Sequence, residues 1–281
     1  MLGRPGFRAA AHCDRADIGE AHVRPLNRPI STWAGRRVWL VGASSGIGAA
    51  LAEQLLQAGA RVAVSARRAE LLQEVANGHP QAIVAPFDIL DQDAWRERHQ
   101  ELCEQMGGVD LIVFCAAAYQ PERSWEVRPE GAAHTLAVNL GSVYTGLAVV
   151  LPAMLMRGSG GIAIIASVAG YIGLPNASVY GPSKAALINL AELLYLDLQP
   201  RGLDVYLINP GFVQTPLTAQ NTFAMPALQT PQAAAKAIRQ GLAAGQFEIH
   251  FPKRFTLVLK LLRWLPYRWR FAVISRILPA Q

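Results

Sequence analysis

Two residues able to move a proton lie four positions apart, Tyr180 and Lys184, and Ser167 lies thirteen positions before the tyrosine. On a helix, a spacing of four places the phenol and the ammonium on one face, a turn apart. An unperturbed tyrosine has a pKa of about 10, so it needs help to act as an acid or base at neutral pH. A nearby positive charge stabilises the phenolate, and a serine hydroxyl can hold a carbonyl oxygen beside the phenol. The set therefore indicates proton exchange with a carbonyl or alcohol, although Tyr-Lys pairs also occur by chance on surface helices.

A glycine-rich turn lies between an apolar run at 38–41 and a segment with helical periodicity at 46–58. The turn contains Gly42, Gly46 and Gly48, spaced G-x-x-x-G-x-G. Glycines let the backbone approach a pyrophosphate, and the start of a helix offers unpaired N–H groups and a positive dipole end. The pattern predicts a nucleotide phosphate site, with a tight turn that binds no ligand as the alternative.

Strand-like and helix-like segments alternate along the chain. Strands are expected near 37–42, 61–65, 82–86, 109–116, 161–166, 203–208 and 247–251, and helices near 46–58, 68–77, 91–106, 130–157, 178–199 and 231–244. This alternation predicts the α/β class: a doubly wound, Rossmann-like parallel sheet of about seven strands in a single domain. Ligands of such sheets lie outside the carboxyl ends of the strands, where Gly42, Asp88, Ala116, Ser167 and Pro210 fall.

Together these motifs resemble the short-chain dehydrogenase/reductase family over about residues 34–251. The family's active-site set matches Asn139, Ser167, Tyr180 and Lys184. The resemblance places cofactor-binding residues at Gly42, Ser44, Ser45, Gly46, Ile47, Gly48, Arg67, Arg68, Asp88, Ile89, Ala116, Asn139, Tyr180, Lys184, Pro210, Gly211, Val213 and Thr215. No metal ligands are expected.

The resemblance also implies a mechanism, hydride transfer between a nicotinamide and a carbonyl or alcohol carbon. Tyr180 would exchange the proton with the substrate oxygen, and Ser167 would hold that oxygen. Lys184 would lower the pKa of Tyr180 and hold the nicotinamide ribose. Asn139 would keep a water beside Lys184 as a proton path.

Two positions differ from the family pattern. Val41 stands where a threonine or serine usually precedes the first glycine, and Phe114-Cys115-Ala116-Ala117 replaces the usual Asn-Asn-Ala-Gly. Losing one partner of a buried polar pair costs about 1–3 kcal/mol, whereas replacing both with apolar groups can be nearly neutral. We therefore interpret Val41 and Cys115 as a matched apolar replacement, and Cys115 as a core residue.

The segment after the second expected strand bears on the choice of cofactor. An acid there would bind the ribose 2′-hydroxyl of NAD, whereas an arginine favours the 2′-phosphate of NADP. Ala66 stands where the family's NAD-dependent members carry the acid, and Arg67 and Arg68 follow it. NADP is therefore favoured over NAD, although the basic residue that some NADP-dependent members carry in the glycine loop is replaced by Ser45.

The region after Thr215 covers the substrate in the family. Its Leu, Phe and Met residues, among them Phe223 and Met225, and its lack of charge indicate an apolar substrate. Tyr171, Ile172 and Leu174 are expected on the opposite side. A pocket without Arg or Lys is a poor host for a small carboxylate, although an apolar lid need not report on the substrate at all.

The tail, 253–281, carries seven basic residues and no acid. A helical wheel from Phe255 places Lys253, Thr256, Lys260 and Arg263 on one side and Phe255, Val258, Leu259, Leu261, Leu262 and Leu265 on the other. The apolar run is too short for a bilayer, which needs about 20 residues. A basic amphipathic helix with Trp264, Tyr267 and Trp269 fits a membrane surface through 253–278. Packing on the domain or on a partner subunit is the alternative.

The net charge, the cysteines and the N-terminal segment limit the possible partners and the cellular location of the protein. Of the net charge of +6, the tail contributes +7 and residues 1–32 contribute +2, which leaves −3 for the middle, so the high pI indicates no nucleic-acid partner. Three cysteines without metal-type spacing indicate reduced thiols and a cytoplasmic setting. Residues 1–33 are expected to be a disordered arm rather than a secretory signal or transit peptide, and residues 34–252 form the catalytic domain.

Three functions remain open on these grounds. The first is an NADP(H)-dependent carbonyl reductase or alcohol dehydrogenase for an apolar, lipid-like substrate, a homo-dimer or tetramer by family resemblance. The second is a nucleotide-binding regulatory or scaffold protein, against which the complete set of Ser167, Tyr180 and Lys184 speaks. The third is a membrane-peripheral protein whose function lies in its tail. Turnover of ketones with NADPH would separate the first from the other two.

Overall fold

The computed structural model describes residues 24–277, and their centre is a parallel sheet of seven strands. The strands are β1 (Arg37–Val41), β2 (Arg61–Ser65), β3 (Ala82–Val84), β4 (Leu111–Phe114), β5 (Gly160–Ile165), β6 (Leu203–Pro210) and β7 (Glu248–Phe251). Their order, β3-β2-β1-β4-β5-β6-β7, reverses between β1 and β4. The predicted Rossmann-like sheet is confirmed, and its switch point lies where such folds bind ligands.

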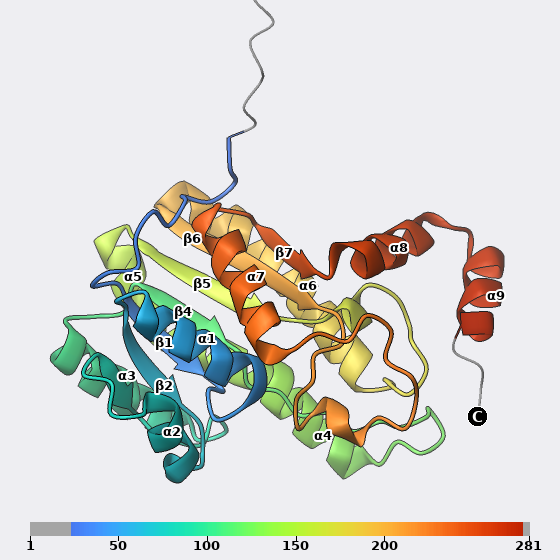
Figure 1. The fold of residues 1–281 in the computed structure, drawn as a ribbon, viewed down its shortest axis with the longest axis horizontal. Coiled ribbons are helices and arrows are strands. Elements are labelled where there is room, and N and C mark those ends of the chain that lie inside the picture. Colours follow the sequence, from blue (N-terminus) through green and yellow to red (C-terminus); the bar gives the residue numbers. More distant parts are fainter. Residues whose placement is uncertain (1–23, 278–281) are drawn as a thin grey trace, which may run out of the picture.

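Helices cover both faces of the sheet (Figure 1). They are α1 (Gly46–Gln57), α2 (Ala69–Ala76), α3 (Gln92–Met106), α4 (Pro129–Leu136), α5 (Ser142–Arg157), α6 (Tyr180–Leu198), α7 (Pro231–Ala243), α8 (Lys253–Trp264) and α9 (Tyr267–Ile277). Buried residues of α1, α2 and α7 form one core cluster, and those of α3, α5 and α6 form the other. The sheet is therefore the middle of three layers.

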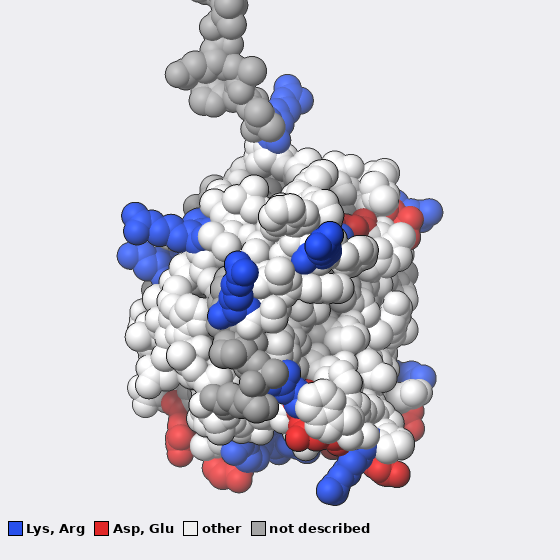
Figure 2. Space-filling view, turned by 90° about the vertical axis from the view of Figure 1, so that its right-hand side faces the viewer, with Lys and Arg blue, Asp and Glu red and all other residues white. Residues whose placement is uncertain are grey.

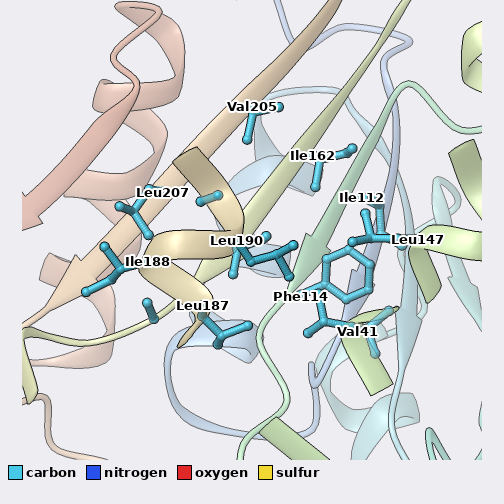
Figure 3. Packing of buried hydrophobic residues seen from close by; sticks show 14 of the residues in the cluster. Val41, Ile112, Phe114, Leu147, Ile162, Leu187, Ile188, Leu190, Val205 and Leu207 are labelled. Carbon is cyan, nitrogen blue, oxygen red and sulfur yellow. The ribbon is translucent and has the colours of Figure 1, made fainter. Parts of the chain in front are cut away.

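The strands are apolar on both sides, as in other parallel sheets whose two faces are covered by helices, and they therefore contribute to a hydrophobic core on each face. Figure 3 shows Leu187 and Leu190 of α6 packed against Ile162, Val205 and Leu207 of the strands. Burying a side chain of this kind stabilises a fold by about 1.5–3 kcal/mol. This packing sets the position of α6, the helix that carries both Tyr180 and Lys184.

The helix expected at 130–157 is interrupted by a π-helical turn, Ala137–Gly141, which contains Asn139. Such turns often occur at functional sites. Pro129–Arg157 is also the one described segment long and apolar enough to cross a membrane, with a mean hydropathy of 1.6. Its Leu147, Val150 and Met154 are buried in the core, and core helices can have the same length and hydropathy, so the segment is only a weak indication of a membrane span.

The expectation of a disordered arm to residue 33 is wrong for the part that the structure describes. Asn27 Nδ2 donates to Val205 O at 2.8 Å, and Asn27 Oδ1 accepts from Val205 N at 3.0 Å. Ile30 and Trp33 are buried in the α1/α7 core cluster. Residues 24–33 therefore belong to the domain, whereas residues 1–23 lie outside the described range.

The tail forms two helices instead of one, because Pro266 ends α8 and restricts Leu265 to extended backbone. Arg270 of α9 donates to the carbonyls of Leu262 and Leu265, both at 3.1 Å, and these bonds fix α9 against the end of α8. In Figure 1, α8 and α9 extend from the β7 edge at the opposite end of the molecule from α2 and α3.

A polar cluster attaches α8 to the sheet. Glu248 of β7 accepts hydrogen bonds from Tyr171 at 2.5 Å and Asn209 at 2.9 Å, and it pairs with Lys260 of α8. Burial raises the pKa of Glu248, but these donors outweigh it and hold the pKa below its ordinary value. Thr256, Leu259 and Leu262 are buried beneath the helix. The packing alternative is therefore right for this face of α8.

We expect Glu248→Ala to lower the free energy of unfolding by about 2 kcal/mol, because three donors lose a partly buried acceptor. The pKa of the Glu248 carboxyl is lower in the folded chain than in the unfolded one. The carboxylate therefore contributes its full stabilisation above the unfolded pKa, and this contribution is lost as the pH falls through the folded pKa. The gap between variant and parent should thus narrow in acid. Urea unfolding at several pH values measures it, with the exposed Glu130→Ala as control. A gap independent of pH would contradict the ionised pair.

Candidate active site

A cleft of about 330 Å³ opens at the carboxyl edge of the sheet, beside the switch point. Its lining includes these predicted residues: Gly42, Ser44, Ser45, Gly46, Ile47, Arg67, Arg68, Asp88, Ile89, Ala116, Ser167, Tyr180, Lys184, Pro210, Gly211, Val213 and Thr215. Gly48 and Asn139 are the two predicted site residues outside this lining. Segments far apart in sequence meet here because the carboxyl ends of all seven strands share one edge.

The glycine turn has backbone that other residues would distort. Gly46 has φ +57°, and a Cβ there would lie 2.7 Å from Thr215 Cγ2. A Cβ on Gly48 would lie 2.2 Å from the carbonyl oxygen of Gly42. Gly48 therefore acts by letting α1 pack against the turn, which explains why it does not line the cleft.

The start of α1 suits an anion. Ser45 is its N-cap residue, and among the described residues no side chain caps this helix and no acid lies in its first turn. In contrast, Asp91 caps α3 by accepting hydrogen bonds from Asp93 N and Ala94 N. The first N–H groups of α1 are thus available to a phosphate at the positive end of the helix dipole. The donor set fits the pyrophosphate of a dinucleotide.

The three residues of the proton-transfer set come together at this cleft. Ser167 follows β5, where its Oγ accepts from Ala169 N at 3.1 Å. Lys184 is only 2% exposed, and its Nζ donates to Ile165 O at 2.9 Å. The same Nζ lies 5.4 Å from the ring centroid of Tyr180. The helical spacing of four thus places the ammonium beside the phenol, as the sequence predicts.

Burial shifts the pKa of both residues of this pair. Burial raises the pKa of Tyr180 above its ordinary value, although the hydrogen bond with Ser167 acts in the opposite direction. Burial also lowers the pKa of Lys184 to about 8. The pKa of Tyr180 is therefore raised overall in this structure, because desolvation outweighs the hydrogen bond with Ser167. That Lys184 lowers this pKa stays a prediction. A phenol that stays protonated at neutral pH is suited to donate a proton.

Asn139 is a structural brace in the described residues. Its Oδ1 accepts from Ala118 N at 2.7 Å, and its Nδ2 donates to Ala118 O at 3.0 Å and to Ser183 Oγ at 3.0 Å. These bonds hold the loop after β4 against α6. The water-holding role of Asn139 stays a prediction.

A second cavity of about 360 Å³ adjoins the cleft, and Ser167 and Tyr180 line both. Apolar side chains from separate segments line the second cavity: Val168, Leu174, Phe212, Leu217 and Phe223. Of the residues expected here, Leu174 and Phe223 take part. Tyr171 and Ile172 do not, because they are buried in the core, and Met225 instead contacts Asn221 through its sulfur.

Arg123 lines the second cavity, so the expectation of a pocket without Lys or Arg is wrong. Its guanidinium lies 5.8 Å from the ring centroid of the exposed Trp125. Tyr119 was also missed. Its ring packs edge-on against Tyr180 with centroids 4.9 Å apart, and its hydroxyl donates to Asn221 Oδ1 at 2.7 Å. The sequence could have indicated both residues, because they follow the carboxyl end of β4, where ligands of such sheets bind.

The two departures from the family pattern leave the strands paired. Cys115 N donates to Val41 O at 2.8 Å, so the backbone ladder continues past both positions. Burial raises the pKa of the Cys115 thiol to about 11, which keeps it protonated and unreactive at neutral pH.

Comparison with known proteins agrees with this geometry. A family model described as short chain dehydrogenase matches residues 36–225. An uncharacterized oxidoreductase of Myxococcus xanthus is 33% identical over 235 residues, covering 82% of this chain and 93% of that protein. A 2-(R)-hydroxypropyl-CoM dehydrogenase of Xanthobacter autotrophicus is 32% identical over 193 residues, covering 64% and 75%.

Solved structures give the same result. A short-chain dehydrogenase from Streptomyces avermitilis has a TM-score of 0.75 at 26% identity, covering 86% of this chain and 97% of its own. A short-chain dehydrogenase/reductase from Burkholderia phymatum, solved in complex with NAD, has a TM-score of 0.74 at 23% identity, covering 82% and 93%. The chain belongs to the short-chain dehydrogenase/reductase family of nucleotide-binding oxidoreductases.

Proposed function

We propose that the protein is an NADP(H)-dependent oxidoreductase acting on a carbonyl or alcohol group of an apolar, lipid-like substrate. The observation that carries the proposal is that Ser167 and Tyr180 line both the nucleotide cleft and the apolar cavity. A substrate oxygen in the cavity can thus reach both hydroxyls while its carbon faces the cleft. The bound nicotinamide supplies or accepts the hydride.

Each residue of the site has a definite task under this proposal. Tyr180, which is protonated at neutral pH, gives its proton to the carbonyl oxygen during reduction. Ser167 donates a hydrogen bond to the same oxygen and stabilises the negative charge that develops there. Lys184 would hold the ribose of the bound nucleotide. Asn139 keeps the loop at Ala118 in place and holds a water from the same turn.

NADP is the proposed cofactor because two exposed guanidinium groups border the cleft. Arg67 and Arg68 both line it, and within the described chain neither pairs with an acid. Ala66 brings no carboxylate that would repel a 2′-phosphate. A guanidinium matches a phosphate through bidentate hydrogen bonds. The NAD in the Burkholderia phymatum structure belongs to that protein, which is 23% identical.

We expect Arg67→Ala to lower the affinity for NADPH about 10-fold and to leave that for NADH nearly unchanged, because only NADPH loses a charge-assisted hydrogen bond. Dissociation constants for both nucleotides measure this effect. Arg61→Ala is a control that removes an arginine outside the cleft. Equal affinities of the parent chain for NADPH and NADH would contradict the assignment.

The substrate proposal is tested by oxidation of NADPH in the presence of methyl ketones and aldehydes of increasing chain length. The apolar lining predicts that kcat/KM rises with chain length. Small polar ketones without a carboxylate, which Arg123 would attract, are the control and should be poor substrates. Nucleotide binding without turnover of any carbonyl or alcohol would instead favour a regulatory or scaffold protein on this fold.

We also propose a cytoplasmic homo-oligomer, a dimer or tetramer. The support is family resemblance together with the exposed apolar side chains Tyr144 on α5 and Leu193 and Leu196 on α6. Light scattering of the purified chain would give the number of subunits.

A further inference from the structure

The described tail exposes several apolar side chains on α8 and α9, at one end of the molecule. We call this set the tail surface: Leu257, Val258, Leu261, Trp264, Leu265, Tyr267, Trp269 and Phe271, all exposed, with Trp264 at 88% and Leu261 at 68%. Monomeric proteins rarely leave such patches without a partner. No described segment of the chain covers them.

Helix α8 is apolar on two sides. At 3.6 residues per turn, the buried Thr256, Leu259 and Leu262 lie opposite Leu257, Leu261 and Trp264. The first side packs on the domain and is held there by the pair between Lys260 and Glu248. No other part of the described chain covers the second side. It is exposed although α8 is packed on the domain through its first side.

Exposed basic residues lie on the same two helices as the tail surface. Lys253, Arg254, Arg263, Arg268 and Arg276 are exposed, and in the described structure none of them pairs with an acid. The sequence has no acid after Glu248. Figure 2 views this end of the molecule: most of the face is uncharged, basic side chains are scattered over it and at its edges, and acidic ones lie mainly along the lower margin.

We propose that the tail surface docks on an anionic lipid bilayer, with α8 and α9 lying in its interface. Tryptophan and tyrosine prefer the headgroup level, and basic residues beside them pair with anionic headgroups. With 12 and 11 residues, α8 and α9 are too short to span a bilayer. The surface therefore fits peripheral docking.

A second copy of the chain fits this surface less well. A two-fold contact places the same patch against itself. The five cations would then face their own copies, with no acid in the tail to pair with them. An anionic lipid surface instead complements the charge and also receives the apolar side chains.

The first turn of α8 also contacts the wall of the apolar cavity. The ring of Phe255 lies 5.9 Å from that of Phe212, which in turn lies 5.9 Å from that of Phe223, and the last two line the cavity. One helix therefore joins the lipid-facing side chains to the cavity. The docking itself does not depend on the proposed reaction.

The test is co-sedimentation of the full chain with phosphatidylcholine vesicles that contain phosphatidylglycerol, against phosphatidylcholine alone. The chain should bind the anionic vesicles, and added salt should weaken binding without abolishing it, because charges are screened and apolar contacts are not. Leu261→Ser with Trp264→Ser, and separately Arg254→Gln with Arg263→Gln, should each lower the partition coefficient about 10-fold or more.

Matched controls use the same substitutions at exposed sites elsewhere. Leu26→Ser with Trp125→Ser, at 56% and 78% exposure, and Arg128→Gln with Arg201→Gln should bind vesicles as the parent does. Failure of the parent chain to bind, or equal losses in the controls, would overturn the proposal. If the tail variants change the oligomeric mass instead, the surface joins copies of the chain and the proposal is wrong. Ketone turnover is read separately, because the tail positions line neither cavity.

Discussion

Tyr180→Phe should lower turnover by about 100-fold or more and leave nucleotide binding intact, because it removes the proton donor and keeps the ring. The ring packs on Tyr119 and lies beside Lys184, so the fold around it should persist. Steady-state kinetics and NADPH titration measure the two effects. A fall in kcat with an unchanged nucleotide dissociation constant is the expected result.

Tyr119→Phe is a matched control, since it makes the same chemical change one ring away from Tyr180. It removes only the hydrogen bond to Asn221, at 2.7 Å, from the loop that covers the cavity. Its effect on kcat should therefore be small. If both variants lose turnover equally, the proton does not come from Tyr180 alone.

Lys184→Met should also lower turnover by about 100-fold, yet leave the protein as stable as the parent or more stable. The parent holds a buried ammonium with one hydrogen bond, to Ile165 O, and desolvation of such a group is unfavourable. Methionine has a similar length and carries no charge. Loss of function without loss of stability would mark Lys184 as a residue retained for its chemistry.

The pH dependence of the free energy of unfolding provides a second test of the role of Lys184. Its folded pKa of about 8 lies below the ordinary 10.5. Between these values the unfolded chain binds a proton that the folded one has released, so this group makes stability rise with pH across that window. The rise should be smaller in Lys184→Met than in the parent, and unchanged in Lys236→Met, which alters an exposed lysine on α7. A variant less stable than its parent at every pH would mean that the ammonium supports the fold.

The proposed binding of the tail surface to lipid and the chemistry of the active site depend on different residues of this protein. Glu248 and Lys260 hold α8 to the domain, while Tyr180 and Lys184 lie on α6 at the cleft. Variants of the tail surface should therefore change lipid binding alone, and variants of α6 should change turnover alone.

The sequence by itself determined the sheet, the order of its elements along the chain and more than half of the cleft lining, with every predicted site residue except Gly48 and Asn139 in that lining. These features are local: apolar strands, the glycine turn at Gly42 to Gly48 and the spacing of Tyr180 and Lys184 depend on residues a few positions apart. The strand edge then brings the motifs together, because in a parallel sheet every strand ends on the same side.

Only the tertiary structure decided which groups are buried and what they contact. Asn27 bonds Val205 across 178 positions and Tyr171 bonds Glu248 across 77, and no local period reports such contacts. The partial burial of Tyr180, which raises its pKa, likewise depends on packing from several elements. The two apolar sides of α8 show the same limit. A helical wheel shows which residues share a side, but only the packed domain shows that Leu259 is covered and Leu261 is left exposed.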